Sequence, residues 1–423
     1  MLTLPKYSAG IGDRFGRQGV AQLQALQYMA AQGVTIAPVW NKSFREHVLA
    51  GTAPADVRAA AAAAVRTAQW RGSYFVDADH ITLKTVEAFL EACDFFTIDV
   101  ADWIGREPSA TEADESAKRL AHLATEHEIS GMDRPLRITA EQLRAILGNY
   151  LLAVREAGRI YRRIIAAKGE GKCIIEVSMD ECATPQGPSE IWVILALLAD
   201  EGVPAQTFAP KFSGRFNKGV DYSGDVEKFR REFRDDVAAI AAAARSFDLP
   251  PNLKISVHSG SDKYSLYGPM RETLRAMDAG LHLKTAGTTW LEELIGLAEA
   301  GGEGLAVART ICEKALTRID ELCQPYAAVI EIDRRRLPTP EEIRGWNGDA
   351  LVRALRHDQR DRLFNPHFRQ LLHVAYKVAA ELGERFTRAL EEHADVIGAR
   401  VANNLKRHLE MLFKNSAAQA ICS

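Results

Sequence analysis

Short apolar runs of β-prone residues alternate with longer amphipathic stretches through most of the chain. A run over Val34–Ser43 is followed by an Ala-rich helical stretch over Pro54–Trp70, and a further run over Ser73–His80 comes next. Strands that are joined through helices by short connections run parallel, because a parallel pair needs a crossover segment. The pattern therefore predicts repeated strand–helix units.

Eight strands are predicted when the count begins at the first apolar stretch. They are Ser8–Phe15, Val34–Ser43, Ser73–His80, Phe95–Trp103, Lys172–Glu181, Pro204–Phe212, Leu253–Lys263 and Leu281–Trp290. This count predicts an α/β fold, a (β/α)8 barrel of the TIM type, with its site at the carboxyl ends of the strands. A ninth candidate, Ala327–Ile332, could replace Ser8–Phe15 in the ring without changing the strands that carry ionisable residues.

Two regions depart from this rhythm. Residues 104–170 contain acidic and helical material, and we expect a helical insertion without strands of its own. Apolar spacing over Phe368–Phe413 is heptad-like, so residues 336–423 are predicted to form a helical extension packed on a catalytic barrel of residues 1–335. The extension could cap the barrel or form a contact in a homo-oligomer.

Ionisable side chains are placed within or directly after four of the predicted strands. They are Asp79, His80, Glu176, His258, His282 and Lys284. Side chains alternate along a strand, so His282 and Lys284 share one face. Burial of such groups is unfavourable unless they are paired or bound to a metal. The four strands therefore predict one site where their ends converge.

Three of these residues, His80, His258 and His282, are candidate metal ligands. Imidazoles that converge from separate strands suit a divalent cation with open positions for substrate. Zinc, manganese, nickel and cobalt are not distinguished by such a set. The alternative is a structural hydrogen bond for each ring, since the spacing alone is not a metal signature.

Glu176 and Asp79 are the candidate acid and base, because carboxylates on different strands can lie on opposite sides of a substrate. Glu176 could instead be a fourth metal ligand, or pair with Lys284 or Lys211. Cationic residues at the same end of the barrel suit an anionic substrate, most simply a carboxylate. Lys42, Lys211 and Lys284 are the candidate substrate-binding residues, with solvated surface charge as the alternative.

Composition narrows the class of protein further. The 53 Lys and Arg against 56 Asp and Glu give a net charge of -3, which favours no nucleic-acid partner. No glycine-rich nucleotide motif is present, the apolar runs are too short for a membrane span, and the amino terminus lacks a signal-peptide pattern. The 6 cysteines are scattered without a C-x-x-C pair, so we expect reduced thiols and a cytoplasmic location.

Long motifs of the chain resemble the tagaturonate epimerase family from Tyr7 to about Ala380. The motifs are YSAGIGDRF, PVWNKS, YFVDADHI, FFTIDVADWIG, EVSMDE, APKFSGRFNKGVDY, SVHSGSDK and LHLKTAGTTWLEELIGLA. That family interconverts D-tagaturonate and D-fructuronate in hexuronate catabolism and depends on a divalent metal. The resemblance implies His80, His258 and His282 as metal ligands, Asp79 as proton acceptor and Glu176 as proton donor.

The reaction that the resemblance implies inverts the 4-position, whose C–H bond is not adjacent to the ketone. Simple deprotonation there is implausible, so we expect retro-aldol cleavage and re-addition, with prior migration of the carbonyl as the rival route. The alternative functions are a 4-epimerase of neutral ketohexoses, a class II-like sugar aldolase, and a non-catalytic binder of sugar acids.

Overall fold

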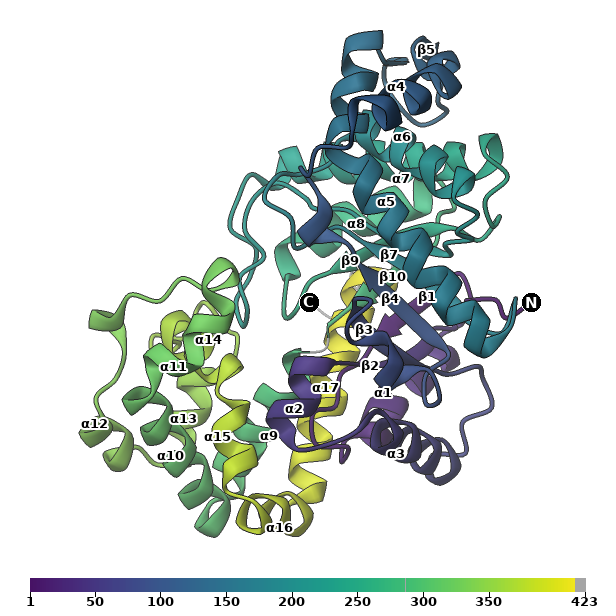
Figure 1. Cartoon of the computed structure of the whole chain (residues 1–423). Helices are drawn as coiled ribbons and strands as arrows, with labels where there is room; N and C mark the ends of the chain where they lie inside the picture. The colour runs from purple at the N-terminus through teal and green to yellow at the C-terminus, as the bar shows by residue number, and fades with distance from the viewer. Residues whose placement is uncertain (286, 415–423) are drawn as a thin grey trace.

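The computed structural model describes residues 1–285 and 287–414 and contains a closed barrel of eight parallel strands (Figure 1). The strands are β1 (Tyr7–Gly10), β2 (Ala37–Ser43), β3 (Phe75–Ile81), β4 (Phe95–Asp99), β7 (Ile174–Ser178), β8 (Thr207–Ala209), β9 (Lys254–His258) and β10 (Leu281–Lys284). They are neighbours in this order, and β1 pairs with both β2 and β10 to close the ring. The predicted (β/α)8 barrel is confirmed, with β1 as its first strand.

The alternative eighth strand, Ala327–Ile332, is wrong. A 3-10 helix, η4 (Gln324–Val329), occupies the first half of that segment, and the residues of the second half belong to no strand. Pro325 fixes one backbone angle at the start of this helix, which favours a helical turn over an extended run.

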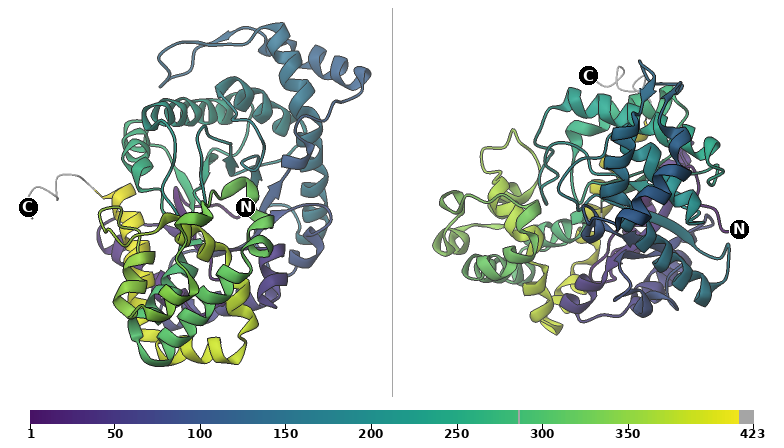
Figure 2. Two further views of the ribbon diagram at one scale, coloured as in Figure 1. Left: turned by 90° about the vertical axis from the view of Figure 1, so that its left-hand side faces the viewer. Right: turned by 45° about the horizontal axis from the view of Figure 1, so that its top comes forward.

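Helices surround the barrel on its outer side (Figure 2). In chain order they include α1 (Gly19–Ala31), α3 (Pro54–Thr67), α5 (Ala140–Lys168), α6 (Pro188–Asp200), α7 (Val226–Ser246) and α8 (Tyr264–Ala276). Among the described helices, none alone has the length and apolarity to cross a bilayer; only α2 (Phe44–Ala50) with α3, bent by 87°, reaches that length and composition together.

The region predicted as an insertion projects from the barrel at the top of Figure 1. It contains α4 (Ala110–Arg119) and a small antiparallel pair, β5 (Glu126–His127) with β6 (Leu136–Arg137), so the expectation of no strands here was wrong. The 29-residue helix α5 packs against β4 and α6 and therefore belongs to the ring of barrel helices.

The last third of the chain forms a helical unit beside the barrel, at the lower left of Figure 1. It runs from α9 (Gly287–Ala300) through α10 (Gly302–Thr317), α11 (Ile319–Cys323), α12 (Pro340–Gly345), α13 (Gly348–Leu355), α14 (Pro366–Val374), α15 (Tyr376–Glu381) and α16 (Glu384–Glu392) to α17 (Ala394–Phe413). Helix α17 packs against α1, α8 and α9, so the chain returns to the ring of barrel helices at its end. The boundary at residue 335 and any oligomer contact stay predictions.

Apolar side chains close the amino-terminal end of the barrel. Leu4 packs with Val39, Phe75, Phe95 and Ile174 in a buried cluster below the strands. Because this end is filled, a ligand has access to the strands only from their carboxyl ends.

Candidate active site

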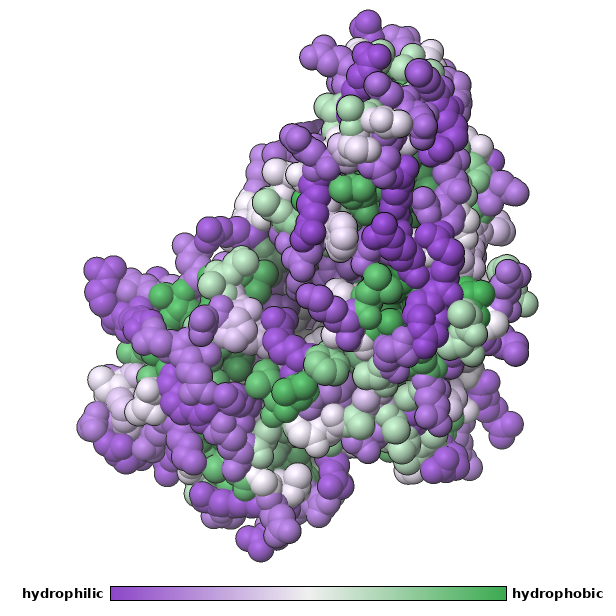
Figure 3. All heavy atoms as spheres, in the orientation of Figure 1, coloured by the Kyte–Doolittle hydropathy of each residue, from purple (hydrophilic) through white to green (hydrophobic). Residues whose placement is uncertain are grey.

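A cavity of about 830 Å³ lies at the carboxyl ends of the barrel strands, where Figure 3 shows the surface hollowed between the barrel and the helical unit. Its lining includes Asp79, His80 and His258 from the barrel. The helical unit contributes Tyr326 and His373 to the same cavity. Barrel and helical unit therefore form one site together.

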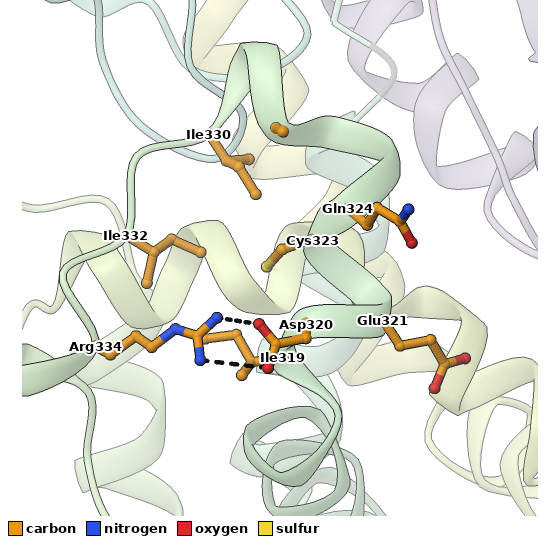
Figure 4. A pocket seen from close by; sticks show the side chains of 9 residues that line it. Ile319, Asp320, Glu321, Cys323, Gln324, Ile330, Ile332 and Arg334 are labelled. Carbon is orange, nitrogen blue, oxygen red and sulfur yellow. Dashed lines mark hydrogen bonds and ion pairs between the residues drawn. The ribbon is translucent and has the colours of Figure 1, made fainter.

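A second cavity, of about 550 Å³, lies within the helical unit (Figure 4). Its walls include Ile330 and Cys323, and its charged residues Arg334 and Asp320 form an ion pair with each other. No catalytic residue predicted from the sequence lines it, so we place the candidate site at the barrel mouth.

An irregularity in β3 brings two consecutive side chains into the cavity. The register between β3 and β4 shifts between Ala78 and Ile81, and His80 has a φ of 50°, in the left-handed region. Regular alternation would direct Asp79 and His80 to opposite faces, whereas both line the cavity here. Backbone strain of this kind persists where the surrounding structure enforces it, often at functional sites.

The imidazoles of His80 and His258 lie edge to face, with ring centroids 5.2 Å apart and an angle of 78° between the ring planes. On His80, Nδ1 is 2.9 Å from Asp99 Oδ2. On His258, Nε2 is 2.9 Å from Glu176 Oε1, and Nδ1 is 3.2 Å from Asp180 Oδ1 without a hydrogen bond among the described residues. Each ring therefore has one nitrogen bound to a carboxylate at 2.9 Å. The second nitrogen lies near a further carboxylate, Asp79 at 4.0 Å for His80 and Asp180 at 3.2 Å for His258.

These contacts favour protonated imidazoles. Burial alone would lower the pKa of His258, but Asp180 and Glu176 outweigh it and raise that pKa to about 9. Burial acts in the same way on His80, where Asp79 and Asp99 raise the pKa well above its usual value. The rings thus carry positive charge among the carboxylates that contact them, and a bound cation would replace those protons.

Three of these residues could hold a metal ion. His80, Asp180 and His258 offer one ligand atom each, all within 4.8 Å of one another, and His80 also belongs to a second such group with Asp99 and Glu181. A carboxylate on the second nitrogen of a ligating histidine orients the ring, which is the arrangement that Asp99 and Glu176 produce. The residues present therefore fit a divalent cation.

His282 does not join either group. Its Nδ1 is 2.9 Å from Ser8 Oγ, and its ring lies 5.2 Å from the ring of Phe95, near the filled end of the barrel. Burial lowers the pKa of His282 to about 3, so the ring is neutral. Its other nitrogen, Nε2, has no hydrogen-bond partner among the described residues.

Lys284 is the centre of a buried ionic cluster. Its Nζ is 2.7 Å from Asp79 Oδ1, 2.9 Å from Asp77 Oδ2 and 2.9 Å from Glu176 Oε1. Gly10 in β1 leaves room for this side chain, since a Cβ there would lie 2.7 Å from Lys284 Cγ. The cluster sets three carboxyl groups against one ammonium, and burial raises the pKa of Asp77 to about 6.

The two candidate proton carriers occupy different depths. Asp79 lines the cavity, and although burial would raise its pKa, Lys284 and His80 hold that pKa below its usual range. Glu176 is fully buried and does not line the cavity; Thr207 Oγ1 donates to it at 2.7 Å, and Lys284 and His258 hold its pKa well below the usual range against the effect of burial. Glu176 is therefore connected to the cavity through His258 and Lys284, which both contact its carboxylate and line the cavity.

Of the three candidate substrate-binding lysines, two line the cavity and one does not. Lys211 lines the cavity and is half-buried. Lys284 lines it too, but its ammonium is engaged by carboxylates. Lys42 does not line it: its Nζ donates to the carbonyl of Arg14 at 2.7 Å and to Thr52 Oγ1 at 2.7 Å. Lys42 thus supports the loop after β1.

Several residues of the site were not singled out from the sequence. Asp99 lies within the predicted strand Phe95–Trp103 and Asp180 near the end of Lys172–Glu181, and both positions also suit residues that only support the barrel or cap the next helix. Arg14 and Asn41 lie near the ends of the first two predicted strands and line the cavity as well. Tyr326 and His373 reach the cavity from the helical unit, and no local pattern marks them.

Comparisons with known proteins identify relatives of the whole chain. A family model described as tagaturonate epimerase matches residues 1–412. The chain is 28% identical over 424 residues to the tagaturonate/fructuronate epimerase of Thermotoga maritima, covering 96% of this chain and 80% of that protein. Crystal structures of a fructuronate-tagaturonate epimerase from Cohnella laeviribosi, native and with one glycerol, each match with a TM-score of 0.79 and 25% identity over 97% of this chain and 82% of that one.

Proposed function

The chain belongs to the tagaturonate epimerase family, and from this premise we propose that it is an isomerase that interconverts D-tagaturonate and D-fructuronate by inverting carbon 4. The observation that carries the proposal is the pair His80 and His258, which lie edge to face beside Asp79 in a cavity at the barrel mouth. A cavity that is lined by carboxylates, imidazoles and cationic side chains suits a polyhydroxylated, negatively charged substrate and a cation.

We propose further that the enzyme requires a divalent cation, held by His80 and His258. Asp180 is the third ligand that the distances favour, whereas His282 is the third ligand implied by the family resemblance. Three buried carboxyl groups surround the single ammonium of Lys284, so this cluster keeps negative charge beside the two histidines when a cation replaces their protons. When bound, the cation would polarise the ketone oxygen of the substrate.

Asp79 is the proposed acceptor of the proton of the 4-hydroxyl group. It lines the cavity, and its carboxylate is oriented by Lys284 at 2.7 Å and by Asn41 Nδ2 at 3.2 Å. As that proton moves to Asp79, the bond between carbons 3 and 4 breaks. Its electron pair stays with carbon 3 and forms the enediolate of the ketone fragment, while carbon 4 becomes the aldehyde carbon of the other fragment. The aldehyde fragment turns, the bond forms again on its other face, and the proton returns to the new 4-alkoxide.

His258 and Glu176 have a supporting part in this proposal. Glu176 accepts from His258 Nε2 and fixes the ring, and it also contacts Lys284 Nζ at 2.9 Å. Any proton transfer between Glu176 and the substrate would have to pass through one of these two side chains. The cavity walls contributed by Tyr326 and His373 confine the fragments before they rejoin.

The test is product analysis by NMR with D-tagaturonate and D-fructuronate, with and without a chelator. The proposal expects interconversion that stops on chelation and returns with added divalent metal. In deuterated water, retro-aldol cleavage expects no label at carbon 3 or 4, and label there would overturn that route. Accumulation of free aldehyde would identify an aldolase, and turnover of neutral ketohexoses alone would identify the neutral-sugar epimerase.

A further inference from the structure

Arg14 carries an unused hydrogen-bonding group at the wall of the cavity. The residue follows β1, is 7% exposed and lines the cavity. Its Nε donates to Glu46 Oε1 at 3.1 Å, while its buried Nη1 has no hydrogen-bond partner among the described residues. A buried guanidinium nitrogen without an acceptor is unfavourable, so its presence points to an acceptor supplied by a ligand.

The position of this guanidinium is firmly set. Its Cζ lies 4.5 Å from the centre of the Tyr376 ring, a cation–π contact with the helical unit. Lys42 Nζ binds the Arg14 carbonyl at 2.7 Å, and Asp13 accepts from the backbone of Gln18 at 2.6 Å. The side chain is therefore held in place before any ligand binds, which favours recognition of a planar anion.

Asn41 links this wall to the proposed proton acceptor. Its Nδ2 donates to Asp79 Oδ2 at 3.2 Å, and its buried Oδ1 has no donor among the described residues. Asn41 precedes Lys42 in β2, and Lys42 holds the Arg14 carbonyl. An unused cationic donor and an unused acceptor thus lie on the part of the wall that leads to Asp79.

We propose that Arg14 binds the carboxylate of the hexuronate and so sets the preference of the enzyme for uronates over neutral ketohexoses. In the substrate the carboxylate carbon is two bonds from carbon 4, whose hydroxyl group is the proposed proton donor to Asp79. Asn41 Oδ1 accepts from the hydroxyl group between them. The inference rests on the proposed function, because it assigns the substrate class of that same site.

The experiment compares wild-type enzyme with Arg14→Gln, Arg14→Lys and a matched control, Arg17→Gln. Arg17 belongs to the same loop, is exposed and pairs with Glu391 at 2.7 Å. The readouts are KM and kcat for the uronate, and calorimetric affinity for a hexonate and for the hexitol of the same configuration. The hexonate and hexitol differ only in the carboxylate, so their comparison requires no turnover.

Arg14→Gln is expected to weaken hexonate binding and raise KM for the uronate by about 100-fold, with hexitol affinity changed less than about 3-fold. Arg14→Lys should bind the hexonate about 10-fold more weakly than the wild type, since lysine keeps the positive charge but lacks the planar guanidinium group that can donate two hydrogen bonds to a carboxylate. The control should match the wild type. Equal losses of affinity for hexonate and hexitol in Arg14→Gln would overturn the inference. So would a loss of hexonate affinity in Lys211→Gln with unchanged hexonate affinity in Arg14→Gln.

The two proposals fail in different ways. If the wild type inverts no hexuronate, the proposed function falls, while the preference for hexonate over hexitol still reports on Arg14. If Arg14→Gln does not fold, as judged by circular dichroism, the test relies on Arg14→Lys. The quantity compared is then the ratio of hexonate affinity to hexitol affinity, and an unchanged ratio in Arg14→Lys counts against the inference.

Discussion

The ring of His80 lies 5.2 Å from the ring of His258, although 177 positions of the chain separate the two residues. Each ring is held by a carboxylate on its far nitrogen, Asp99 for His80 and Glu176 for His258. The two imidazoles are therefore held in place as two ligands of a candidate metal site before any cation binds.

The first prediction concerns the metal content of ligand variants. His80→Ala, His258→Ala and Asp180→Ala should each reduce the divalent metal that copurifies with the protein to less than about a tenth of the wild-type amount, because three protein ligands are the usual number at a catalytic site. His282→Ala should retain the metal, since Ser8 already engages that ring. Elemental analysis of the purified proteins measures the metal content of all four variants. Loss of metal in His282→Ala with retention in Asp180→Ala would support the ligand set implied by the family.

The second prediction concerns the two buried lysines of the barrel. Lys284→Met should lower the free energy of unfolding by about 3–5 kcal/mol, because it leaves Asp77, Asp79 and Glu176 buried without their ammonium partner. Lys254 is the matched control: among residues 1–285 and 287–414, its Nζ binds the backbone carbonyls of Pro5 at 2.7 Å and of Leu4 at 3.2 Å and no carboxylate.

Lys254→Met should lower the free energy of unfolding by less than about 2 kcal/mol, since no buried charge is left unpaired. Urea denaturation at pH 7 compares the two variants. Similar losses in both would mean that the carboxylates around Lys284 do not depend on its charge.

The sequence predicts the barrel and the approach of His80 to His258 because both follow from strand order and strand ends. The depth of a side chain inside the barrel does not follow from alternation. His282 shares a face with Lys284 but lies two residues nearer the filled end, so it contacts Phe95 in place of the cavity.

Lys42 shows where alternation could have been applied further. Asn41 and Lys42 are consecutive in β2, and only Asn41 can face the cavity if Lys42 supports the loop of Arg14. Tyr326 and His373 could not be predicted, because their places depend on how the helical unit packs against the barrel.

The third prediction concerns Asp236, a buried carboxyl group on α7 whose two oxygens have no hydrogen-bond partner among the described residues. Burial raises the pKa of Asp236 well above its usual value. Above about pH 4 the unfolded chain has lost a proton that the folded protein keeps, so stability falls as pH rises towards the folded pKa. Asp236→Asn removes this dependence.

Asp236→Asn should therefore be more stable than the wild type at pH 8 by about 1–3 kcal/mol and should lose that advantage near pH 4. Urea denaturation at both values of pH measures the difference. Asp235→Asn is the control, since its carboxylate pairs with Arg234 at 2.9 Å. An advantage that is constant across pH would show that the Asp236 carboxyl group is not the titrating group.

The fourth prediction concerns the connection between the barrel and the helical unit. Asp262, after β9, accepts from Arg369 Nη2 of α14 at 2.6 Å and is bound by His357 Nδ1 at 3.0 Å and His408 Nε2 at 2.8 Å. All four side chains are buried, and although burial would raise the pKa of Asp262, Arg369 and the histidines hold it well below its usual range. Stability from this group is thus present above about pH 4 and is lost as pH falls below it.

Asp262→Ala should lower the free energy of unfolding by about 3–5 kcal/mol at pH 7, because Arg369 is left as an unpaired buried charge. Activity should fall as well, since Tyr326 and His373 reach the cavity only while the helical unit is packed on the barrel. Urea denaturation at pH 7 measures the stability, an activity assay measures the second effect, and limited proteolysis reports whether the helical unit stays packed on the barrel. Asp358→Asn, beside His357 and paired only with the exposed Arg360 at 3.1 Å, should change neither. Full activity and unchanged proteolysis in Asp262→Ala would mean that apolar packing alone holds the helical unit in place.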